Sequence, residues 1–422
     1  MTTESGCAAL RPRRPLAFAL LGAAASMAIS ASALAQDSIQ IISHRYPALE
    51  FFTQKMAEAL PEMPGEVSLM PIDQATEKAT ITLAAGSDAL DIVYVNEPML
   101  GRFAKAGWLE PLDAYWEQYK EEYDLGDIPE AAVDALRYDG KLYAMPFAVN
   151  VMFFYYRTDL FEEAGIEPPE TFEDYLTYAA QLNSPQRSGT ILTLKPVDAA
   201  MNETHWYLNA IGDGWFDENM KPVFNSPNGI KAIETLKEVS QYAPRGFTAH
   251  ANDESTIAFQ QDFAAMGLQW LTRAAAMDDP EKSRVVGKID WAVPPGGGHS
   301  RISISGYGIS KFSSADKDKL FQILAIGSSA EAQLEAASLS MPLRRSVLAD
   351  PKLKEENRHF EAALAAIEVS EPLPGFPEFI ETAEIVTRYV LQAVTGERPV
   401  KDAMDTAAVE VEALLESRGY YN

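Results

Sequence analysis

Residues 141–182 read KLYAMPFAVNVMFFYYRTDLFEEAGIEPPETFEDYLTYAAQL and predict a buried strand followed by two capped helices. Just before them, Asp139-Gly140 is a favoured hairpin turn, because both residues tolerate positive φ, so the flanking residues should pair. Residues 147–156 form an apolar run rich in Val, Phe and Tyr that is too short to cross a bilayer. This composition predicts a strand that is covered on both faces.

Two helices should follow this strand. Asp159 can cap the first turn of a short helix, and Gly165 can end it in the left-handed conformation. Pro168 forbids continuation of the helix. Thr171 with Asp174 three residues later is a variant of the capping box and predicts the start of a second helix.

This order of elements resembles the extracellular solute-binding proteins of bacterial ABC importers, specifically the sugar-binding family that includes maltose-binding protein. The family pattern Tyr-Ala-x-Pro, then Tyr-x-x-Asp-Leu-Phe-x-x-Ala-Gly-x-x-x-Pro-x-Thr, is matched by Tyr143 to Pro146, Tyr156, Asp159 to Phe161, Ala164-Gly165, Pro168 or Pro169, and Thr171. The usual Tyr-Asn-Lys-Asp is Tyr-Arg-Thr-Asp here. The resemblance implies an α/β fold of two lobes with a central ligand cleft.

The resemblance also implies that the chain crosses between the lobes three times, near Val149-Asn150, 303–306 and 341–342. We therefore expect an N-terminal lobe of residues 36–148 plus 306–340, and a C-terminal lobe of residues 149–305 plus 341–422. Val149 and Asn150 should act as the hinge. The implied function is capture of a sugar between the lobes, followed by delivery to the permease subunits of the importer. We expect a monomer without a cofactor or a bound metal.

The first 35 residues have the pattern of a secretory signal peptide. Three arginines precede the apolar stretch 16–29, and Ala33-Leu34-Ala35 supplies the small residues that a signal peptidase recognises. Cleavage after Ala35 would make Gln36 the first residue of a periplasmic protein. The alternative is an uncleaved membrane anchor.

The composition excludes several classes of partner and chemistry. The 422-residue chain has a net charge of −26, which opposes binding to nucleic acid and to anionic lipid surfaces. Its single cysteine, Cys7, lies in the expected signal peptide. The mature protein should therefore have no disulfide, thiolate metal site or cysteine nucleophile.

Two loops that follow expected strands are candidate ligand sites, because ligands gather beyond the carboxyl ends of strands in α/β sheets. The first holds His44, Arg45 and Tyr46, although His44 could equally cap a helix or face solvent. The second holds Asn96 and Glu97, at the start of a helix that Pro98 can begin. A glutamate at that position could instead only complement the helix dipole.

Further candidates combine hydrogen-bonding groups with aromatic rings, the mixture that a sugar site needs. Glu203 and Trp206 lie in one such cluster, where the resemblance also implies sugar contacts. Trp270 ends an apolar strand, as a cleft tryptophan does in the family, but it could be an ordinary core residue. The resemblance adds Gly306 and Tyr307 beside the solute, and Arg344 near the last crossing. A salt bridge within the C-terminal lobe is an equal alternative for Arg344.

Two other functions compete with the sugar carrier. A carbohydrate-active hydrolase could use paired carboxylates such as Glu97 and Glu203. The chain lacks a His-Glu-x-x-His motif, a Gly-x-Ser-x-Gly elbow and a nucleotide-binding loop, so we expect no enzyme. A ferric-ion carrier is suggested only by the adjacent tyrosines 155–156 and 420–421. Adjacent residues of a strand point to opposite faces, so the first pair is poorly placed to chelate.

Overall fold

The computed structural model describes residues 38–421. The expected signal peptide and the expected first residue Gln36 lie outside this range. Within residues 38–421, no helix combines the length and the apolar character that crossing a membrane requires.

A mixed sheet organises the described chain, with strand order β2-β1-β3-β9-β6-β7. Strands β1, β2 and β3 are parallel to one another, whereas the pairs β3–β9, β9–β6 and β6–β7 are antiparallel. Strand β8 pairs with β6, and β10 pairs with β9. The strands are β1 (Ile39–His44), β2 (Gly65–Met70), β3 (Ile92–Val95), β6 (Met145–Arg157), β7 (Met266–Trp270), β8 (Ile289–Ala292), β9 (Arg301–Ile309) and β10 (Glu371–Pro372).

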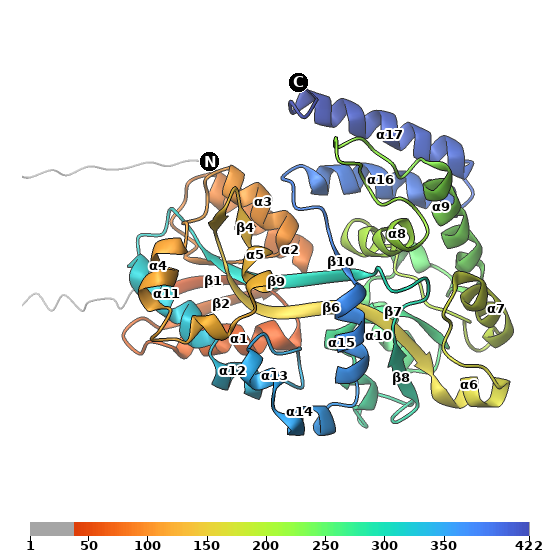
Figure 1. Ribbon diagram of the computed structural model, residues 1–422, viewed down its shortest axis with the longest axis horizontal. Coiled ribbons are helices and arrows are strands. Elements are labelled where there is room, and N and C mark those ends of the chain that lie inside the picture. The colour runs from red at the N-terminus through yellow and green to blue at the C-terminus, as the bar shows by residue number, and fades with distance from the viewer. Residues whose placement is uncertain (1–37, 422) are drawn as a thin grey trace, which may run out of the picture. The chain divides into compact units, whose positions relative to one another are not determined.

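Strand β6 joins two halves of this sheet. Its first part pairs with β9, and its last part pairs with β7 and β8. Figure 1 shows β6 and β9 side by side, running from the half with β1 and β2 into the half with β7 and β8. The long apolar run is therefore a strand shared by both halves.

The side chains of β6 alternate between two hydrophobic clusters, as the period of two residues in a strand requires. Phe153 and Tyr155 belong to a cluster that continues into the half with β1, which we call the shared cluster. Met152 and Phe154 belong to a second cluster, confined to residues of the expected C-terminal lobe, which we call the C-terminal cluster. All four side chains are at most 1% exposed. The prediction of a strand covered on both faces is confirmed.

The predicted hairpin and capping box are also present. Asp139 and Gly140, with φ of 49° and 73°, join β4 (Arg137–Tyr138) to β5 (Lys141–Leu142). Thr171 Oγ1 accepts a hydrogen bond from the backbone N–H of Asp174, and the Asp174 carboxylate accepts one from the backbone N–H of Thr171. These motifs are correct because their hydrogen bonds join residues close together in the sequence.

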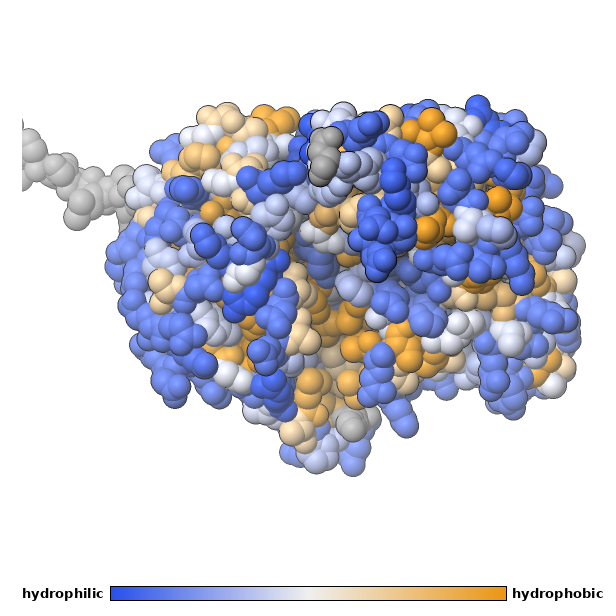
Figure 2. Space-filling model, turned by 45° about the horizontal axis from the view of Figure 1, so that its top comes forward, coloured by the Kyte–Doolittle hydropathy of each residue, from blue (hydrophilic) through white to orange (hydrophobic). Residues whose placement is uncertain are grey.

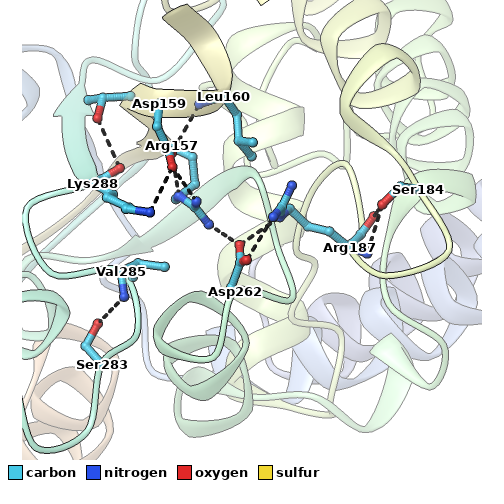
Figure 3. Close-up of polar contacts among 10 residues, drawn as sticks. Arg157, Asp159, Leu160, Ser184, Arg187, Asp262, Ser283, Val285 and Lys288 are labelled. Atoms are coloured by element: carbon cyan, nitrogen blue, oxygen red, sulfur yellow. Dashed lines mark hydrogen bonds and ion pairs between the residues drawn. The ribbon is translucent and has the colours of Figure 1, made fainter. Parts of the chain in front are cut away.

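The prediction that Asp159 caps the short helix α6 (Thr158–Ala164) is wrong, because α6 begins at Thr158, its N-cap position is Arg157 and no side chain caps it. Asp159 accepts a hydrogen bond from the backbone of Leu160. Its carboxylate also binds Arg157 through two nitrogens, Nε at 2.8 Å and Nη2 at 2.7 Å. Figure 3 shows the guanidinium of Arg157 also meeting Asp262, which binds Arg187 in turn. The departure from the family motif at Arg157 thus anchors the end of β6 in an ion-pair network.

Helices cover both halves of the sheet. Helices α8, α9, α16 and α17 lie together over the half with β7 (Figure 1). The helices are α1 (Pro47–Glu58), α2 (Ile72–Ala84), α3 (Glu97–Lys105), α4 (Asp113–Tyr119), α5 (Glu130–Asp134), α6 (Thr158–Ala164), α7 (Phe172–Leu182), α8 (Asp198–Ala210), α9 (Pro227–Val239), α10 (Asn252–Gln260), α11 (Lys317–Gly327), α12 (Ala330–Glu335), α13 (Arg345–Leu348), α14 (Pro351–Glu356), α15 (Phe360–Val369), α16 (Phe379–Val394) and α17 (Val400–Ser417).

The three expected crossings fall on or beside the shared strands. Val149 and Asn150 lie within β6, and residues 303–306 lie within β9. Met341 forms an isolated bridge with Val149. The lobe boundaries themselves stay a prediction.

Hydrophilic residues cover most of the face in Figure 2, and hydrophobic residues lie in separate areas of it. Single apolar side chains on a surface are ordinary. The large apolar side chains that are exposed within residues 38–421 are Ile81, Ile257, Phe263, Val286, Leu334, Val369 and Val409.

Candidate functional site

A polar cavity lies where the two halves of the sheet meet. The space between its side chains is about 460 Å³, a volume that includes open solvent. Its lining comes from segments far apart in the sequence: His44, Tyr46, Ile72, Tyr94, Asn96, Asn150, Asp198, Asn252, Trp270, Thr272, Arg273, Arg301, Ser303 and Ser305.

The first loop brings His44 and Tyr46 to the cavity. His44 is the last residue of β1, and its ring meets the edges of Tyr46 and Tyr94 at centroid distances of 5.0 and 5.9 Å. Burial lowers the pKa of His44 to about 4, opposed by Asp198. The imidazole is therefore neutral at pH 7 and offers one donor and one acceptor. Arg45 faces an adjoining hollow that continues outward from the cavity.

The two candidates of the second loop, Asn96 and Glu97, lie in different surroundings. Asn96 lines the cavity and caps α3, with its Oδ1 accepting from the backbone N of Met99 at 3.3 Å. Glu97 does not line it. Its carboxylate instead accepts hydrogen bonds from the backbone N of Ile304 and from Ser303 Oγ, and it is 6% exposed. Burial raises the pKa of Glu97, and nearby Arg301 opposes this shift. Glu97 thus supports β9 from behind the cavity.

Strand β9 supplies one edge of the cavity through alternate residues. Arg301, Ser303 and Ser305 all line it, because every second side chain of a strand points to the same face. Ser305 Oγ lies 3.1 Å from Tyr46 Oη and 3.4 Å from Tyr94 Oη. This hydroxyl cluster presents both donors and acceptors.

Trp270 is a second predicted aromatic residue, besides Tyr46, that lines the cavity. It ends β7 and is 6% exposed. The Arg301 guanidinium lies over its ring, 5.4 Å from the centroid. Asn150 and Thr272 also line the cavity, where Asn150 Nδ2 donates to Thr272 Oγ1 at 3.4 Å.

The structure places Glu203 and Trp206 outside the cavity, in the interior of the half that contains α8. Both are fully buried. One oxygen of Glu203 accepts from the backbone N and the Oγ1 of Thr193, at 3.1 and 3.0 Å. Trp206 packs against Phe172 and Tyr175 in the C-terminal cluster. The polar and aromatic pattern here belongs to a core helix.

Tyr307 and Gly306 also lie outside the cavity lining. Tyr307 is fully buried, and its hydroxyl is 2.6 Å from Ser43 Oγ. A Cβ on Gly306 would lie 2.5 Å from Leu136 Cδ1 and 2.8 Å from Met145 O. The close approach that Gly306 permits is therefore to the protein's own core.

Arg344 is 1% exposed and points away from the cavity. Its guanidinium donates to the backbone oxygens of Ser328, Tyr123 and Asp124. The alternative of a salt bridge within the C-terminal lobe is also incorrect, since these acceptors are carbonyls in the half with β1. Arg344 ties the chain after Met341 to that half.

Several lining residues were missed in the sequence analysis. Arg301, Ser303 and Ser305 follow a visible alternation with Ile302 and Ile304, which is typical of a strand with one polar face. Asp198 and Asn252 open helices α8 and α10, and they carry no comparable local signal.

Comparisons with known proteins agree with this architecture. A family model described as bacterial extracellular solute-binding protein matches residues 66–334, more than half of the chain. The mannitol-binding protein of Pseudomonas aeruginosa is 26% identical over 226 residues, 52% of this chain and 51% of that protein. That alignment thus spans about half the length of the relative. The arabinooligosaccharide-binding protein of Bacillus subtilis is 22% identical over 382 residues, 81% of this chain and 83% of that protein.

A solved structure extends the similarity to nearly the whole described fold. The ABC transporter solute-binding protein of Agrobacterium radiobacter K84, in complex with ribitol, has a TM-score of 0.80 and 25% identity, covering 89% of this chain and 98% of that one. The two halves of the sheet are thus the two lobes of a periplasmic-binding-protein fold. The chain belongs to the family of bacterial extracellular solute-binding proteins.

Proposed function

We propose that this chain captures a small sugar or polyol in the cavity and delivers it to the membrane subunits of an ABC importer. The observation that carries the proposal is the lining of the cavity by amide, hydroxyl and charged groups from both halves of the sheet. Hydroxyl-rich ligands need such directional donors and acceptors. Relatives named for mannitol, arabinooligosaccharide and ribitol binding support this ligand class.

We further propose that the protein acts in the periplasm as a monomer, with lobes of residues 36–148 plus 306–340 and 149–305 plus 341–422. Rotation about Val149 and Asn150 would close the lobes over the ligand, and the permease would recognise the closed form. His44, Tyr46, Asn96 and Trp270 are the proposed ligand contacts among the residues predicted from sequence, with Arg45 beside them.

The positions of two glutamates and one tyrosine favour a sugar carrier over the hydrolase and the ferric-ion carrier. Neither Glu97 nor Glu203 lines the cavity, so the carboxylate pair that a hydrolase would use does not face a substrate there. Tyr155, one of the tyrosines that suggested a ferric-ion carrier, donates its hydroxyl to the backbone oxygen of Trp270 at 2.6 Å in the core and does not line the cavity.

A thermal-shift screen of mono- and disaccharides and of polyols tests the proposal, because a ligand of the native state raises the melting temperature by mass action. Isothermal titration then measures affinity, and small-angle scattering measures the radius of gyration with and without ligand. We expect binding without product formation and a smaller radius when bound. Release of products from a disaccharide would favour the hydrolase, and an unchanged radius with proven binding would contradict the closure.

A further inference from the structure

Arg301 has an unusual set of partners for a buried guanidinium. It begins β9 and is 2% exposed. Its Nη1 donates to Asn202 Oδ1 and, at 3.3 Å, to Asp198 Oδ1. Its Nε is buried without a partner, and its Nη2 makes no hydrogen bond to any residue in 38–421. Only one of the three nitrogens is therefore satisfied.

Leaving buried charged donors without acceptors is unfavourable, so the missing partners need an explanation. Arg157, which is also 2% exposed, uses all three of its nitrogens. Arg301 differs in one respect that matters, because it lines the cavity and Arg157 does not. Nη2 of Arg301, which is not among the fully buried atoms, therefore points to an acceptor that a ligand supplies, whereas Nε is fully buried.

The position of Arg301 over the Trp270 ring also restricts how a ligand is held. A sugar ring that stacks on tryptophan needs a free aromatic face. Here the guanidinium occupies one face at 5.4 Å from the centroid, and only 6% of the Trp270 surface is exposed. Recognition by hydrogen bonds is favoured over recognition by stacking, and a small ligand is favoured over an extended oligosaccharide.

The charges around the cavity are balanced in pairs. Arg301 is paired with Asp198, and Arg273 is paired with Asp253 at 2.9 Å. Both arginines that line the cavity therefore have a carboxylate partner, and the other nearby cations, Arg45 and Lys195, line the adjoining hollow, so a neutral ligand fits the cavity best. In the Arg301–Asp198 pair, the guanidinium offers hydrogen-bond donors and the neighbouring carboxylate offers acceptors. Two adjacent hydroxyl groups match this pair, since one can accept from Arg301 while its neighbour donates to Asp198.

We propose that Arg301 and Asp198 are the specificity-determining pair of the cavity and bind adjacent hydroxyls of a small neutral polyol or monosaccharide. This inference rests on the proposed function and narrows its ligand class. It assigns direct recognition to Asp198 and Arg301, and Trp270 keeps its place in the cavity lining while its ring also supports the Arg301 guanidinium.

Isothermal titration of the purified protein with ribitol, D-mannitol, D-galactose, maltose and gluconate tests the pair. Arg301→Lys keeps the charge but loses the planar fork of donors, so affinity for the neutral ligand should fall roughly tenfold or more. Asp198→Asn removes the balancing carboxylate. It should weaken neutral binding by a similar factor and strengthen binding of gluconate, which a purely structural role would not do.

Arg344→Lys is the matched control, because Arg344 is as buried as Arg301 but binds only backbone carbonyls outside the cavity. It should lower the melting temperature and leave affinity unchanged. Wild-type affinity retained by Arg301→Lys, or by Asp198→Asn if the first variant does not fold, would overturn the pair. If the wild type preferred gluconate, the proposal of a neutral ligand would be wrong, and if it preferred maltose, the proposal of a small ligand would be wrong. In both cases the protein could still be a sugar carrier. Failure to bind any of a wider panel of sugars and polyols would overturn the proposed function as well.

Discussion

Arg157 and Arg301 lie in two regions of the same sheet and are equally buried, yet their surroundings differ. At the end of β6, Arg157 is held by Asp159 and Asp262, and each nitrogen has an acceptor (Figure 3). At the start of β9, Arg301 has acceptors for Nη1 alone and lines a cavity. Removing a buried charge from a complete set of partners is costly, so Arg157 serves the fold, whereas Arg301 has a nitrogen without an acceptor beside the cavity and can bind a ligand.

The first prediction removes the fully partnered arginine. Arg157→Met should lower the free energy of unfolding by about 3 kcal/mol, because it breaks a buried ion pair whose remaining carboxylates are partly exposed. Ligand affinity should not change, since seven strand residues, or about 23 Å, separate Arg157 from the cavity residue Asn150. Urea unfolding and calorimetric titration measure the two quantities.

Arg187→Gln is the control for this variant, because Arg187 binds the same Asp262 but is 22% exposed. It should lower the free energy of unfolding by less than about 1 kcal/mol. A loss of affinity in Arg157→Met without a loss of stability would reverse the assigned roles of the two arginines.

The second prediction concerns Glu203, a buried carboxyl with a partner for only one of its oxygens. Burial raises the pKa of Glu203 from its ordinary 4.5 to about 7, although bonds from Thr193 oppose the shift. The native state then holds a proton that the unfolded state has lost above pH 4.5. Stability from this group is complete below pH 4.5 and disappears as the pH rises through 7.

We therefore expect the wild type to lose about 2 kcal/mol of stability between pH 5 and pH 8 through Glu203. Glu203→Gln should lack this component, because glutamine does not titrate. Urea unfolding of both proteins at the two pH values gives the difference. Equal pH dependence in the two would mean that Glu203 does not bind the proton in the native state.

The third prediction separates stability from binding at one residue. Asn96→Ala removes the cap of α3 and should lower the free energy of unfolding by about 1 kcal/mol. Asn96→Ser keeps a capping oxygen, so its stability should stay near that of the wild type. Both variants should bind ligand more weakly, because both lose the amide at the cavity. Wild-type affinity in both would exclude Asn96 as a ligand contact.

The smallest effect is expected at an exposed ion pair. Lys105 of α3 lies 2.8 Å from Glu378, and its side chain is 47% exposed. Lys105→Gln should lower the free energy of unfolding by about 0.5 kcal/mol, and 1 M NaCl should abolish the difference because salt screens exposed charges. A difference that persists at 1 M NaCl would show that this pair behaves like a buried one.

Much of the fold was predictable where a motif is local or strictly periodic. The hairpin at Asp139 and the capping box at Thr171 are formed by neighbours in the chain. The burial of β6 on both faces follows from an apolar run without polar alternation. Residues 301–305 show the other strand pattern, in which polar residues alternate with Ile302 and Ile304. This alternation was equally visible in the sequence and would have identified one edge of the cavity.

The site was predicted less well, because the sequence does not show which polar residues are buried away from a cavity. Glu97 and Asn96 are adjacent, but the first supports β9 and the second lines the cavity. Glu203 and Arg344 have side chains that could bind a ligand. In the structure Glu203 accepts hydrogen bonds from Thr193, and Arg344 donates to backbone carbonyls.

The sequence by itself therefore determined the turns, the helix ends and the alternation of strands, since these depend on residues a few positions apart. Only the tertiary structure decided which side chains share the cavity. Asn96, Asn150, Asp198 and Arg301 are separated by long stretches of chain and meet only because β3, β6, α8 and β9 end or cross at one place. The tertiary structure also decided how many acceptors each arginine has. Asp262 folds next to Arg157 and completes its set of acceptors, whereas Asp198 reaches only one nitrogen of Arg301.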